Sequence, residues 1–336
     1  MTGVRLDAAE AQALIEGVFR AAGVAAPAAR ATAAALVSAE IDGQPGHGFS
    51  RVEAYAAQAR SGKVDGAATP VVTRAAPAFL RIDAADGFAF PALDAAIAPL
   101  AALAHEMGVA AAAVTRSHHC GQLGRHVERL AEAGCAALML ANTPKAMAPW
   151  GGTAAFFGTN PIAFAAPRDG HAPLVIDLSL SAVARGKVMA AAQKGQPIPE
   201  GWAFDAEGRP TTDPQAALKG AMAPMGGAKG AALALMVETL AAGLTGAAFS
   251  HEAASFFDAE GAPPRVGQVL IAFGGPGLAQ GFAARLEGML AAMLAQEGAR
   301  LPGDRRLAAR ARAADQGLAM PAALHARLTA ALGGAR

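Results

Sequence analysis

His47 and Arg51 are the two side chains of the N-terminal region that are best suited to act together on a ligand. If a helix has begun at His47, their spacing puts both side chains on one helical face. Imidazole titrates near neutrality and can give a proton to a developing alkoxide, whereas guanidinium can hold a carboxylate through two parallel hydrogen bonds. The pair therefore indicates a proton donor beside an anion clamp. The same short motif would also fit a helix-capping histidine and a surface arginine.

A second candidate segment, Ser117–Gly124, places polar and flexible residues directly after the apolar run Val109–Val114. Functional loops often occupy such a strand end. Adjacent side chains point in different directions, so at most one of His118 and His119 should face a ligand, and we predict that it is His119. Cys120 would fit a ligand or a reactive thiol, but a small buried side chain is the more common role of cysteine.

Three further segments have the composition of loops at element ends: Gly158–Pro161, Asp177–Ser179 and Gly226–Gly230. The first two adjoin β-type runs and would also fit simple turns. The third opens a predicted helix, where free N–H groups and the positive end of the helix dipole can bind phosphate. By itself, its Gly-Gly-Ala-Lys-Gly sequence is a weak signal.

Several familiar catalytic motifs do not occur in the sequence. A Gly-x-Gly-x-x-Gly turn between a strand and a helix, a Walker loop, a Gly-x-Ser-x-Gly elbow and a His-Glu-x-x-His helix are all missing. Cys120 and Cys135 lack the spacing of a zinc cluster, and both are expected to be reduced. The sequence therefore predicts no Rossmann domain and no metal site.

The elements that must position these segments alternate between helix and strand. Two helices are expected between Asp7 and about Asp42, with breaks near Gly23 and Pro27. Further helices are expected at about 91–107, from after His119 to 133, at 181–194 and at 228–242. Strands are expected at 71–73, 79–82, 109–114, 136–140, 162–165, 174–177 and 268–273. Pro197–Pro214 reads as a polar connection, and closing helices follow the arginine-rich segment Arg300–Arg312. This alternation favours an α/β sandwich.

Composition limits the classes of partner. Of 336 residues, 53% are hydrophobic and 16% are charged, enough for a large core in two or three subdomains. The 28 basic and 27 acidic residues leave a formal net charge of +1, which would not hold a nucleic-acid backbone or an anionic membrane. No segment resembles a membrane span, and Met1–Ala13 lacks the apolar run of an export signal. We therefore expect a cytoplasmic protein without nucleic-acid or membrane partners.

Taken in order, these loops resemble the malate/L-lactate dehydrogenase family of the second type, which includes sulfolactate, ureidoglycolate and malate dehydrogenases and Δ1-piperideine-2-carboxylate reductase. The resemblance spans nearly the whole chain. It is carried by several motifs in register: His47-Gly48 with Arg51, Ser117–Gly121, Phe157–Pro167 (FGTNPIAFAAP), Ile198–Pro214 (IPEGWAFDAEGRPTTDP), Gly226–Gly230 and Leu301–Arg306 (LPGDRR).

The resemblance implies a homodimer with an α/β, non-Rossmann fold: a three-layer sandwich around a mixed sheet of about seven strands, with helical subdomains. We expect residues 1–60 to form an N-terminal helical segment that packs with the C-terminal helices of 300–336. Residues 61–120 and 190–299 would form the NAD(P)-binding sheet domain, and 121–189 a smaller subdomain.

The resemblance also implies roles for individual residues. His47 would donate a proton to the substrate, Arg51 would hold its carboxylate, and His119, Thr159 and Arg185 would lie near it. The cofactor would be lined by His119, Cys120, Gly121, Gln122, Leu123, Asp177, Leu178, Ser179, Ala228, Lys229 and the segment 303–309, which includes Gly303, Asp304, Arg305 and Arg306. Arg305 and Arg306 could meet a 2′-phosphate, so NADP(H) is favoured, and NAD(H) remains possible.

Two departures from the cyclic-imine reductases of the family bear on the substrate. Where those enzymes have a serine before the histidine and an aspartate in a later Ala-x-Gly-Asp segment, this chain has Gly46 and Lys187. A proposed Ser/Asp relay is therefore missing. An ammonium in place of a carboxylate should disfavour a protonated imine and favour a substrate with a second anion. Lys187 would equally fit a solvent-exposed lysine.

The expected reaction is reversible hydride transfer between C4 of a nicotinamide and C2 of a 2-oxo acid. Lys187, helped by Arg185, would hold a distal sulfonate or carboxylate, which ranks 3-sulfolactate/sulfopyruvate before malate/oxaloacetate. One alternative is reduction of Δ1-piperideine-2-carboxylate or Δ1-pyrroline-2-carboxylate. An alternative of another class is a non-catalytic nucleotide-binding protein.

Overall fold

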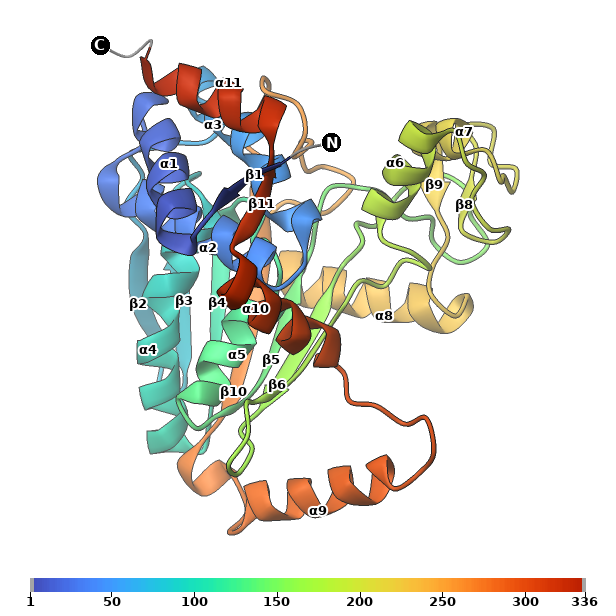
Figure 1. Ribbon diagram of the computed structural model, residues 1–336. Helices are drawn as coiled ribbons and strands as arrows, with labels where there is room; N and C mark the ends of the chain where they lie inside the picture. Colours follow the sequence, from blue (N-terminus) through green and yellow to red (C-terminus); the bar gives the residue numbers. More distant parts are fainter. Residues whose placement is uncertain (1–2, 334–336) are drawn as a thin grey trace.

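A mixed sheet of seven strands lies at the centre of the molecule (Figure 1). The structure is a computed structural model and describes residues 3–333. The strand order is β2 (Val71–Ala76), β3 (Phe79–Asp83), β4 (Val109–Ser117), β10 (Val266–Phe273), β5 (Ala136–Ala141), β6 (Ile162–Ala166) and β7 (Leu174–Leu178). The pair β3 and β4 is parallel, and the other neighbours in the sheet are antiparallel. The predicted mixed sheet of about seven strands is confirmed.

Alternate side chains of β5 show how the two faces of the sheet are covered. Ala137 and Met139 belong to the core beneath α4 (Ala89–Met107) and α5 (Gly124–Glu132). Leu138 and Leu140 belong to the core beneath α8 (Ala228–Glu238) and the π-helical turn that follows it. Because neighbouring side chains of a strand point to opposite faces, α4 and α5 lie on one side and α8 on the other. The fold is therefore a three-layer α/β sandwich, as predicted.

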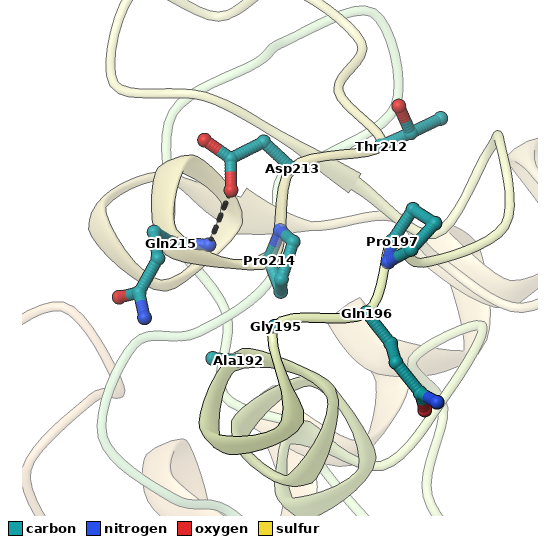
Figure 2. Close-up of a pocket in the computed structure, with 8 residues that line it drawn as sticks. All are labelled: Ala192, Gly195, Gln196, Pro197, Thr212, Asp213, Pro214 and Gln215. Atoms are coloured by element: carbon teal, nitrogen blue, oxygen red, sulfur yellow. Dashed lines mark hydrogen bonds between the residues drawn. The ribbon is translucent and has the colours of Figure 1, made fainter.

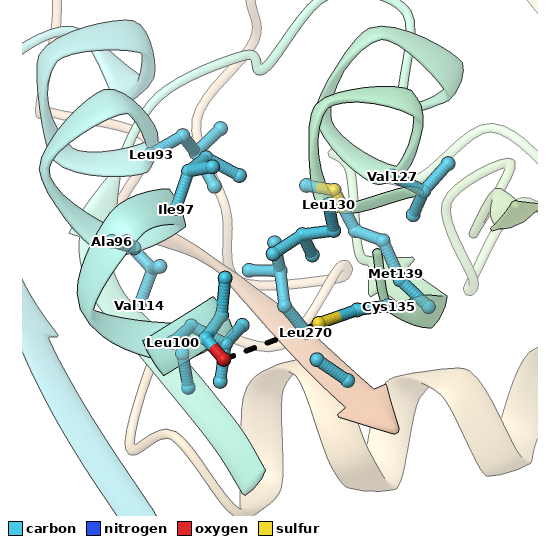
Figure 3. Close-up of a cluster of buried hydrophobic side chains, with 14 of the residues drawn as sticks. Leu93, Ala96, Ile97, Leu100, Val114, Val127, Leu130, Cys135, Met139 and Leu270 are labelled. Atoms are coloured by element: carbon cyan, nitrogen blue, oxygen red, sulfur yellow. Dashed lines mark hydrogen bonds between the residues drawn. The ribbon is translucent and has the colours of Figure 1, made fainter. Parts of the chain in front are cut away.

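The main core lies between the sheet and helices α4 and α5 (Figure 3). Leu93, Ile97 and Leu100 recur at helical spacing along α4 and form an apolar stripe. They belong to one buried cluster with Met139 of β5 and Leu270 of β10. Burying one such side chain stabilises the fold by about 1.5–3 kcal/mol, so this cluster fixes the central strands beneath the helices.

A second core joins the two ends of the chain. β1 (Gly3–Leu6) pairs antiparallel with β11 (Leu318–Pro321). Around this pair lie α1 (Ala8–Ala21), α2 (Ala26–Ile41), α3 (Val52–Ser61) and α11 (Ala322–Gly333), whose buried faces form one cluster. A capping box begins α1, in which the Asp7 carboxylate accepts from the Glu10 N–H and the Glu10 carboxylate from the Asp7 N–H. The two helices predicted between Asp7 and about Asp42 are thus present.

Residues 181–225 form a small lobe beside the sheet (Figure 1). It contains α6 (Arg185–Lys194), β8 (Ala203–Phe204), α7 (Pro214–Lys219) and β9 (Ala221–Met222). The expected division assigned 121–189 to a smaller subdomain, but strands β5 to β7 are hydrogen-bonded members of the main sheet. The division of the chain into domains stays a prediction. The assignment of cofactor binding to a particular domain stays a prediction.

The last part of the chain before β11 contains α9 (Phe282–Leu294) and α10 (Asp304–Gln316). No helix among residues 3–333 combines the length and the apolarity needed to cross a membrane.

A buried group of charges fastens α10 to α2 and α5. Arg310 donates to Asp42 at 2.5 and 3.2 Å and to Glu128 at 2.6 and 2.9 Å. Arg306 donates to Glu128 at 2.6 Å, and Gln122 donates to Asp42 at 2.8 Å. Burial opposes ionisation of Glu128, but the bonds from the two arginines hold its pKa below the ordinary value. The network therefore contains two buried carboxylates that depend on two guanidinium groups.

Removing one of these guanidinium groups should destabilise the fold. Arg310→Met would leave Asp42 and Glu128 buried with too little positive charge, and we expect it to lower the free energy of unfolding by about 3 kcal/mol in urea denaturation. Arg312→Met is the control, since Arg312 lies exposed on the same helix. An equal, small effect of both substitutions would show that the network does not stabilise the fold.

Candidate active site

One edge of the sheet carries the strand-end segments that were singled out in the sequence. Ser117 at the end of β4 pairs with Val266 at the start of β10. Further across, Ile162 at the start of β6 pairs with both Leu140 and Leu178. These pairs form a row across the sheet, so the loops that leave it here belong to the same edge: 118–123, 142–161 and 179–184.

The glycine-rich segment Gly226–Gly230 also reaches this edge. Ser181 forms a bridge with Pro224, and the Met225 N–H donates to the Leu180 carbonyl at 2.8 Å. Helix α8 therefore begins beside the end of β7. Gly230 must lack a side chain, because a Cβ there would collide with the carbonyl oxygen of Met225.

Glu40 of α2 anchors the segment that contains His47. The Glu40 carboxylate accepts from the Phe49 N–H at 2.6 Å, and a Cβ at Gly48 would overlap that carboxylate. Two 3-10 turns, Pro45–His47 and Phe49–Arg51, precede α3. His47 and Arg51 therefore do not lie on one α-helical face, contrary to the expectation from their spacing. The α-helix begins only at Val52, after the segment that Glu40 holds.

His47 lies against His119, the ligand-facing histidine that was predicted from the segment Ser117–Gly124. The two rings stack with centroids 5.2 Å apart and an interplanar angle of 14°. Nδ1 of His47 is buried without a hydrogen-bond partner among the described residues, so Nε2 is the nitrogen left to meet a ligand. The structure thus brings together two histidines that are 72 positions apart in the sequence.

Tyr55 of α3 determines how His119 can act. Its hydroxyl is hydrogen-bonded to Nδ1 of His119 and has no other partner in the described chain. Burial, the main cause, raises the pKa of Tyr55, so the phenol keeps its proton. A buried hydroxyl proton needs an acceptor, and Nδ1 is the one within reach. We therefore assign the His119 proton to Nε2, which makes this nitrogen a hydrogen-bond donor.

Burial and neighbouring positive charge keep these histidines neutral. Burial, followed by the charge of Arg51, lowers the pKa of His47 to about 4. The same causes, in the same order, hold the pKa of His119 well below its ordinary value. Burial, then Lys63 and Arg51, lowers the pKa of His118 to about 3. Arg51 is thus the cation whose field acts on all three rings.

Arg51 has one fixed edge and one free edge. Its Nε donates to the carbonyl of Gly46 at 2.7 Å, and its Cζ lies 4.9 Å from the centre of the Phe257 ring. Within residues 3–333 it has no carboxylate partner and no other hydrogen bond. The two terminal nitrogens therefore remain for an external anion, and the geometry suits a bidentate carboxylate.

The predicted cofactor segments contribute backbone and a few side chains. Residues 119–123 are buried, and the side chain of Gln122 is taken by Asp42. Asp177 accepts from the Gly124 N–H at 2.7 Å. Burial raises the pKa of Cys120 to about 12, so this residue is a thiol rather than a thiolate. Ser179 contacts Ser181, with 3.2 Å between the hydroxyl oxygens.

The two arginines expected at a 2′-phosphate, Arg305 and Arg306, differ in whether they have an ion-pair partner within the described chain. Arg306 is committed to Glu128, whereas Arg305 is exposed and has no ion pair in the described part of the chain. Asp304 accepts from the Leu301 N–H at 3.1 Å and steadies the start of α10. Of the pair, only Arg305 is thus available for a phosphate.

The three remaining substrate candidates lie on two elements. Thr159 is half-buried in the loop before β6, and its carbonyl accepts from the Leu180 N–H at 2.8 Å. Arg185 donates to the Leu218 carbonyl at 2.9 Å, which ties α6 to α7. Lys187 is exposed in the first turn of α6, and no hydrogen bond or ion pair of its side chain occurs within residues 3–333. Their contact with a substrate stays a prediction.

A pocket in the lobe contains none of the residues just described (Figure 2). It lies between the end of α6 and the start of α7, lined by Gln196, Pro197 and Asp213 among others. The carboxylate of Asp213 caps α7 by accepting from the Gln215 N–H at 2.8 Å. With this group used for capping, the histidine and arginine cluster is the better candidate for chemistry.

Four residues near this cluster were not singled out in the sequence: Glu40, Tyr55, Phe256 and Phe257. Phe256 lies 5.1 Å from His119 and 5.2 Å from His118, measured between ring centres. Tyr55 had a local signal, since it follows Arg51 by four residues, but the phenylalanines are about 200 residues away in the sequence.

Comparisons with known proteins agree over nearly the full length. A protein-family model described as malate/L-lactate dehydrogenase matches residues 6–329. The (2R)-3-sulfolactate dehydrogenase (NADP(+)) of Chromohalobacter salexigens is 52% identical over 315 residues, covering 94% of this chain and 94% of that protein. A Δ1-pyrroline-2-carboxylate/Δ1-piperideine-2-carboxylate reductase of Pseudomonas putida is 44% identical over 326 residues, covering 95% of this chain and 94% of that protein.

Similarity extends to solved structures. The Δ1-piperideine-2-carboxylate reductase of Pseudomonas syringae pvar. tomato has a TM-score of 0.92 and 42% sequence identity, covering 98% of this chain and 99% of that chain. At this level of agreement the shared fold includes the sheet edge and the segments around it.

The titration of His47 tests the electrostatics of the site. We expect its ring signals in NMR to titrate near pH 4. Arg51→Gln should raise this pKa, because it removes one positive neighbour while burial remains. Arg60→Gln, an exposed change near the end of α3, should leave it unchanged. A His47 pKa that is equal in all three proteins would show that Arg51 does not act on this ring.

Proposed function

Because the chain belongs to the malate/L-lactate dehydrogenase family, we propose that this oxidoreductase interconverts a 2-oxo acid with a second anionic group and the corresponding 2-hydroxy acid, using NADP(H). We rank 3-sulfopyruvate/3-sulfolactate first and oxaloacetate/malate second. The observation that carries the proposal is the free edge of Arg51, whose charge acts on the neighbouring His47 ring. The 52% identical relative, named for NADP(+)-dependent sulfolactate oxidation, supports the ranking.

In this proposal Arg51 orients the substrate. Its two terminal nitrogens bind the 2-oxo acid carboxylate, while the bond from Nε to Gly46 limits rotation of the guanidinium. The carbonyl at C2 is then held near the histidine stack. Nε2–H of His119 can donate a hydrogen bond to a substrate oxygen.

His47 supplies the proton in the direction of reduction. A hydride adds to C2, and Nε2–H of protonated His47 passes its proton to the carbonyl oxygen as it becomes a hydroxyl. The neutral ring takes a proton back in oxidation. A bound carboxylate offsets the charge of Arg51, which removes one cause of the low His47 pKa and eases protonation when substrate is present.

The residues present fit a phosphorylated nicotinamide cofactor. The N-terminus of α8 follows two glycines with positive φ and carries Lys229, a combination that suits a phosphate group. Arg305 is free for the 2′-phosphate that distinguishes NADP from NAD. When bound, the cofactor supplies the hydride, and NAD(H) remains a possible second cofactor.

Lys187 is the proposed partner of the second anion. It lies exposed without a competing carboxylate in the described chain, and its helix follows the loop that leaves β7 at the active edge. An ammonium there favours a sulfonate or carboxylate over a protonated imine.

The relatives that reduce cyclic imines support a second candidate activity. Two of them are 44% and 42% identical to this chain. Reduction of Δ1-piperideine-2-carboxylate or Δ1-pyrroline-2-carboxylate would use the same carboxylate clamp, Arg51, and the same hydride donor.

We also propose that the protein is a cytoplasmic homodimer. The outer side of α8 and the turn after it exposes Leu233, Leu235, Met236 and Leu244, with exposed fractions of 38–56% and no charged side chain among them. A continuous apolar face of this kind is typical of protein interfaces. Both cysteines are buried and free, which suits a reducing compartment.

A substrate panel tests the function and the role of Lys187 together. With NADPH, sulfopyruvate should give the highest kcat/KM, ahead of oxaloacetate, pyruvate and Δ1-piperideine-2-carboxylate, and NADH should be the poorer cofactor. Lys187→Asp should reduce the preference for sulfopyruvate over pyruvate by about tenfold or more, because it reverses a charge near the second anion. Lys194→Asp on the same helix is the control.

Two results would contradict this reading. If the cyclic imine were the best substrate, the chain would belong with the imine reductases in function. If Lys187→Asp left the preference unchanged, the second anion would be held by another group.

The pH dependence tests His47. Reduction needs protonated His47, whose pKa is about 4 in the free protein, so kcat/KM for reduction should fall steadily as the pH rises from about 5 to about 8. Oxidation needs the neutral ring, and its kcat/KM should stay level in the same interval. His47→Asn should lower turnover by about 10²–10⁴-fold, whereas His171→Asn, an exposed change, should not. Retention of most activity in His47→Asn would rule out its role as the acid.

A further inference from the structure

Two aromatic side chains of the segment 256–260 lie against His119 and against the proposed anion clamp, Arg51. The Phe256 ring is buried beside His118 and His119, with centroid distances of 5.2 and 5.1 Å. The next residue, Phe257, is 51% exposed, and its ring lies 4.9 Å from Cζ of Arg51. One short loop thus contacts both His119 and Arg51.

Three side chains at the end of α3 hold the backbone of this loop. Gln58 donates to the carbonyls of Phe256 and Asp258 at 2.9 and 3.0 Å. Ser61 donates to the Ala259 carbonyl at 2.6 Å. Lys63 donates to the carbonyls of Asp258 and Glu260 at 2.9 and 3.1 Å. Every residue from 256 to 260 except Phe257 therefore has its carbonyl bound by α3 or the residues just after it.

The burial of these anchors is unusual for a surface loop. Gln58 is fully buried and Lys63 is 2% exposed, yet the ammonium has no ion pair in the described chain. Covering an ammonium that has only carbonyl partners is unfavourable, and burial lowers the pKa of Lys63 although Asp258 opposes this. Such a cost is understandable if the position of the loop matters to the site.

Two contacts restrain the Arg51 side chain, and the loop provides one of them. Nε is held by the Gly46 carbonyl, and Cζ of the guanidinium lies over the Phe257 ring. A guanidinium stacked on an aromatic face is attracted to it and loses rotational freedom. Its remaining edge then points in a single direction.

We propose that the segment 256–260 is a fixed aromatic wall of the active site, in which Phe257 is a positioning residue that sets the direction from which Arg51 meets the substrate carboxylate. Lys63 and Gln58 keep the wall in place from outside the site. The inference rests on the proposed function for the identity of the substrate, but carboxylate binding can be measured without turnover.

Calorimetric binding of oxalate to the full chain saturated with NADP⁺ tests the wall. Phe257→Leu should weaken oxalate binding about fivefold, in line with loss of one cation–π contact. The KM for sulfopyruvate should rise by a similar factor while kcat stays within about twofold. Phe257→Tyr, which keeps the ring, should bind oxalate like the wild type. Phe273→Leu, an exposed phenylalanine at the far end of β10, is the matched control.

A double variant separates positioning from general destabilisation. Lys63→Met should also weaken oxalate binding, because it frees the loop. Combined with Phe257→Leu, it should add little further loss, since both changes act on the same contact. Lys219→Met, an exposed lysine of α7, should have no effect.

The inference is overturned if Phe257→Leu binds oxalate like the wild type, if the effects of the two variants add fully, or if the wild type binds no oxalate. If oxalate binding follows the expected pattern while no 2-oxo acid is reduced, the wall stands and the proposed function fails.

Discussion

The pairing of β10 with both β4 and β5 is the constraint on which the rest of the structure depends. β10 begins 125 positions after the end of β5, and without it the two earlier strands would not be neighbours. Its insertion aligns Ser117, Ala141 and, through β6, Leu178 along one edge. The start of the strand also packs closely on the turn after α8, where a Cβ at Gly267 would collide with the carbonyl of Ala241. The sheet thus sets the separation of the candidate cofactor and substrate groups.

The charges within the site include one guanidinium that has no carboxylate partner among the described residues. Arg51 has no internal partner among the described residues, and three histidines near it are kept neutral by burial and by its own field. In the scaffold, the buried carboxylates of Asp42 and Glu128 are compensated by two arginines. The uncompensated guanidinium of Arg51 at the site favours ligands that carry a carboxylate.

Local patterns in the sequence predicted the elements with strong periodicity, such as the apolar stripe of α4 and the run that forms β4. They could not predict β1 and β11, because strands of four residues form here only by pairing across the length of the chain. The same limit applies to the site. His47, Arg51 and His119 had recognisable neighbours, whereas the commitment of Arg306 to Glu128 and the contact of Phe257 with Arg51 depend on residues about 180 and 200 positions away.

The pairing of β1 with β11 has a consequence for synthesis of the chain on the ribosome. α1 and α2 emerge early, but part of their apolar surface is covered only by Leu318, Met320, Leu324 and Leu328. At elongation rates of about 5–20 residues per second, that surface stays uncovered for roughly 15 seconds or more. The core formed by α1, α2, α3 and α11 around the β1–β11 pair is therefore the last region to be completed. During this interval the apolar surface of the first helices is accessible to chaperones.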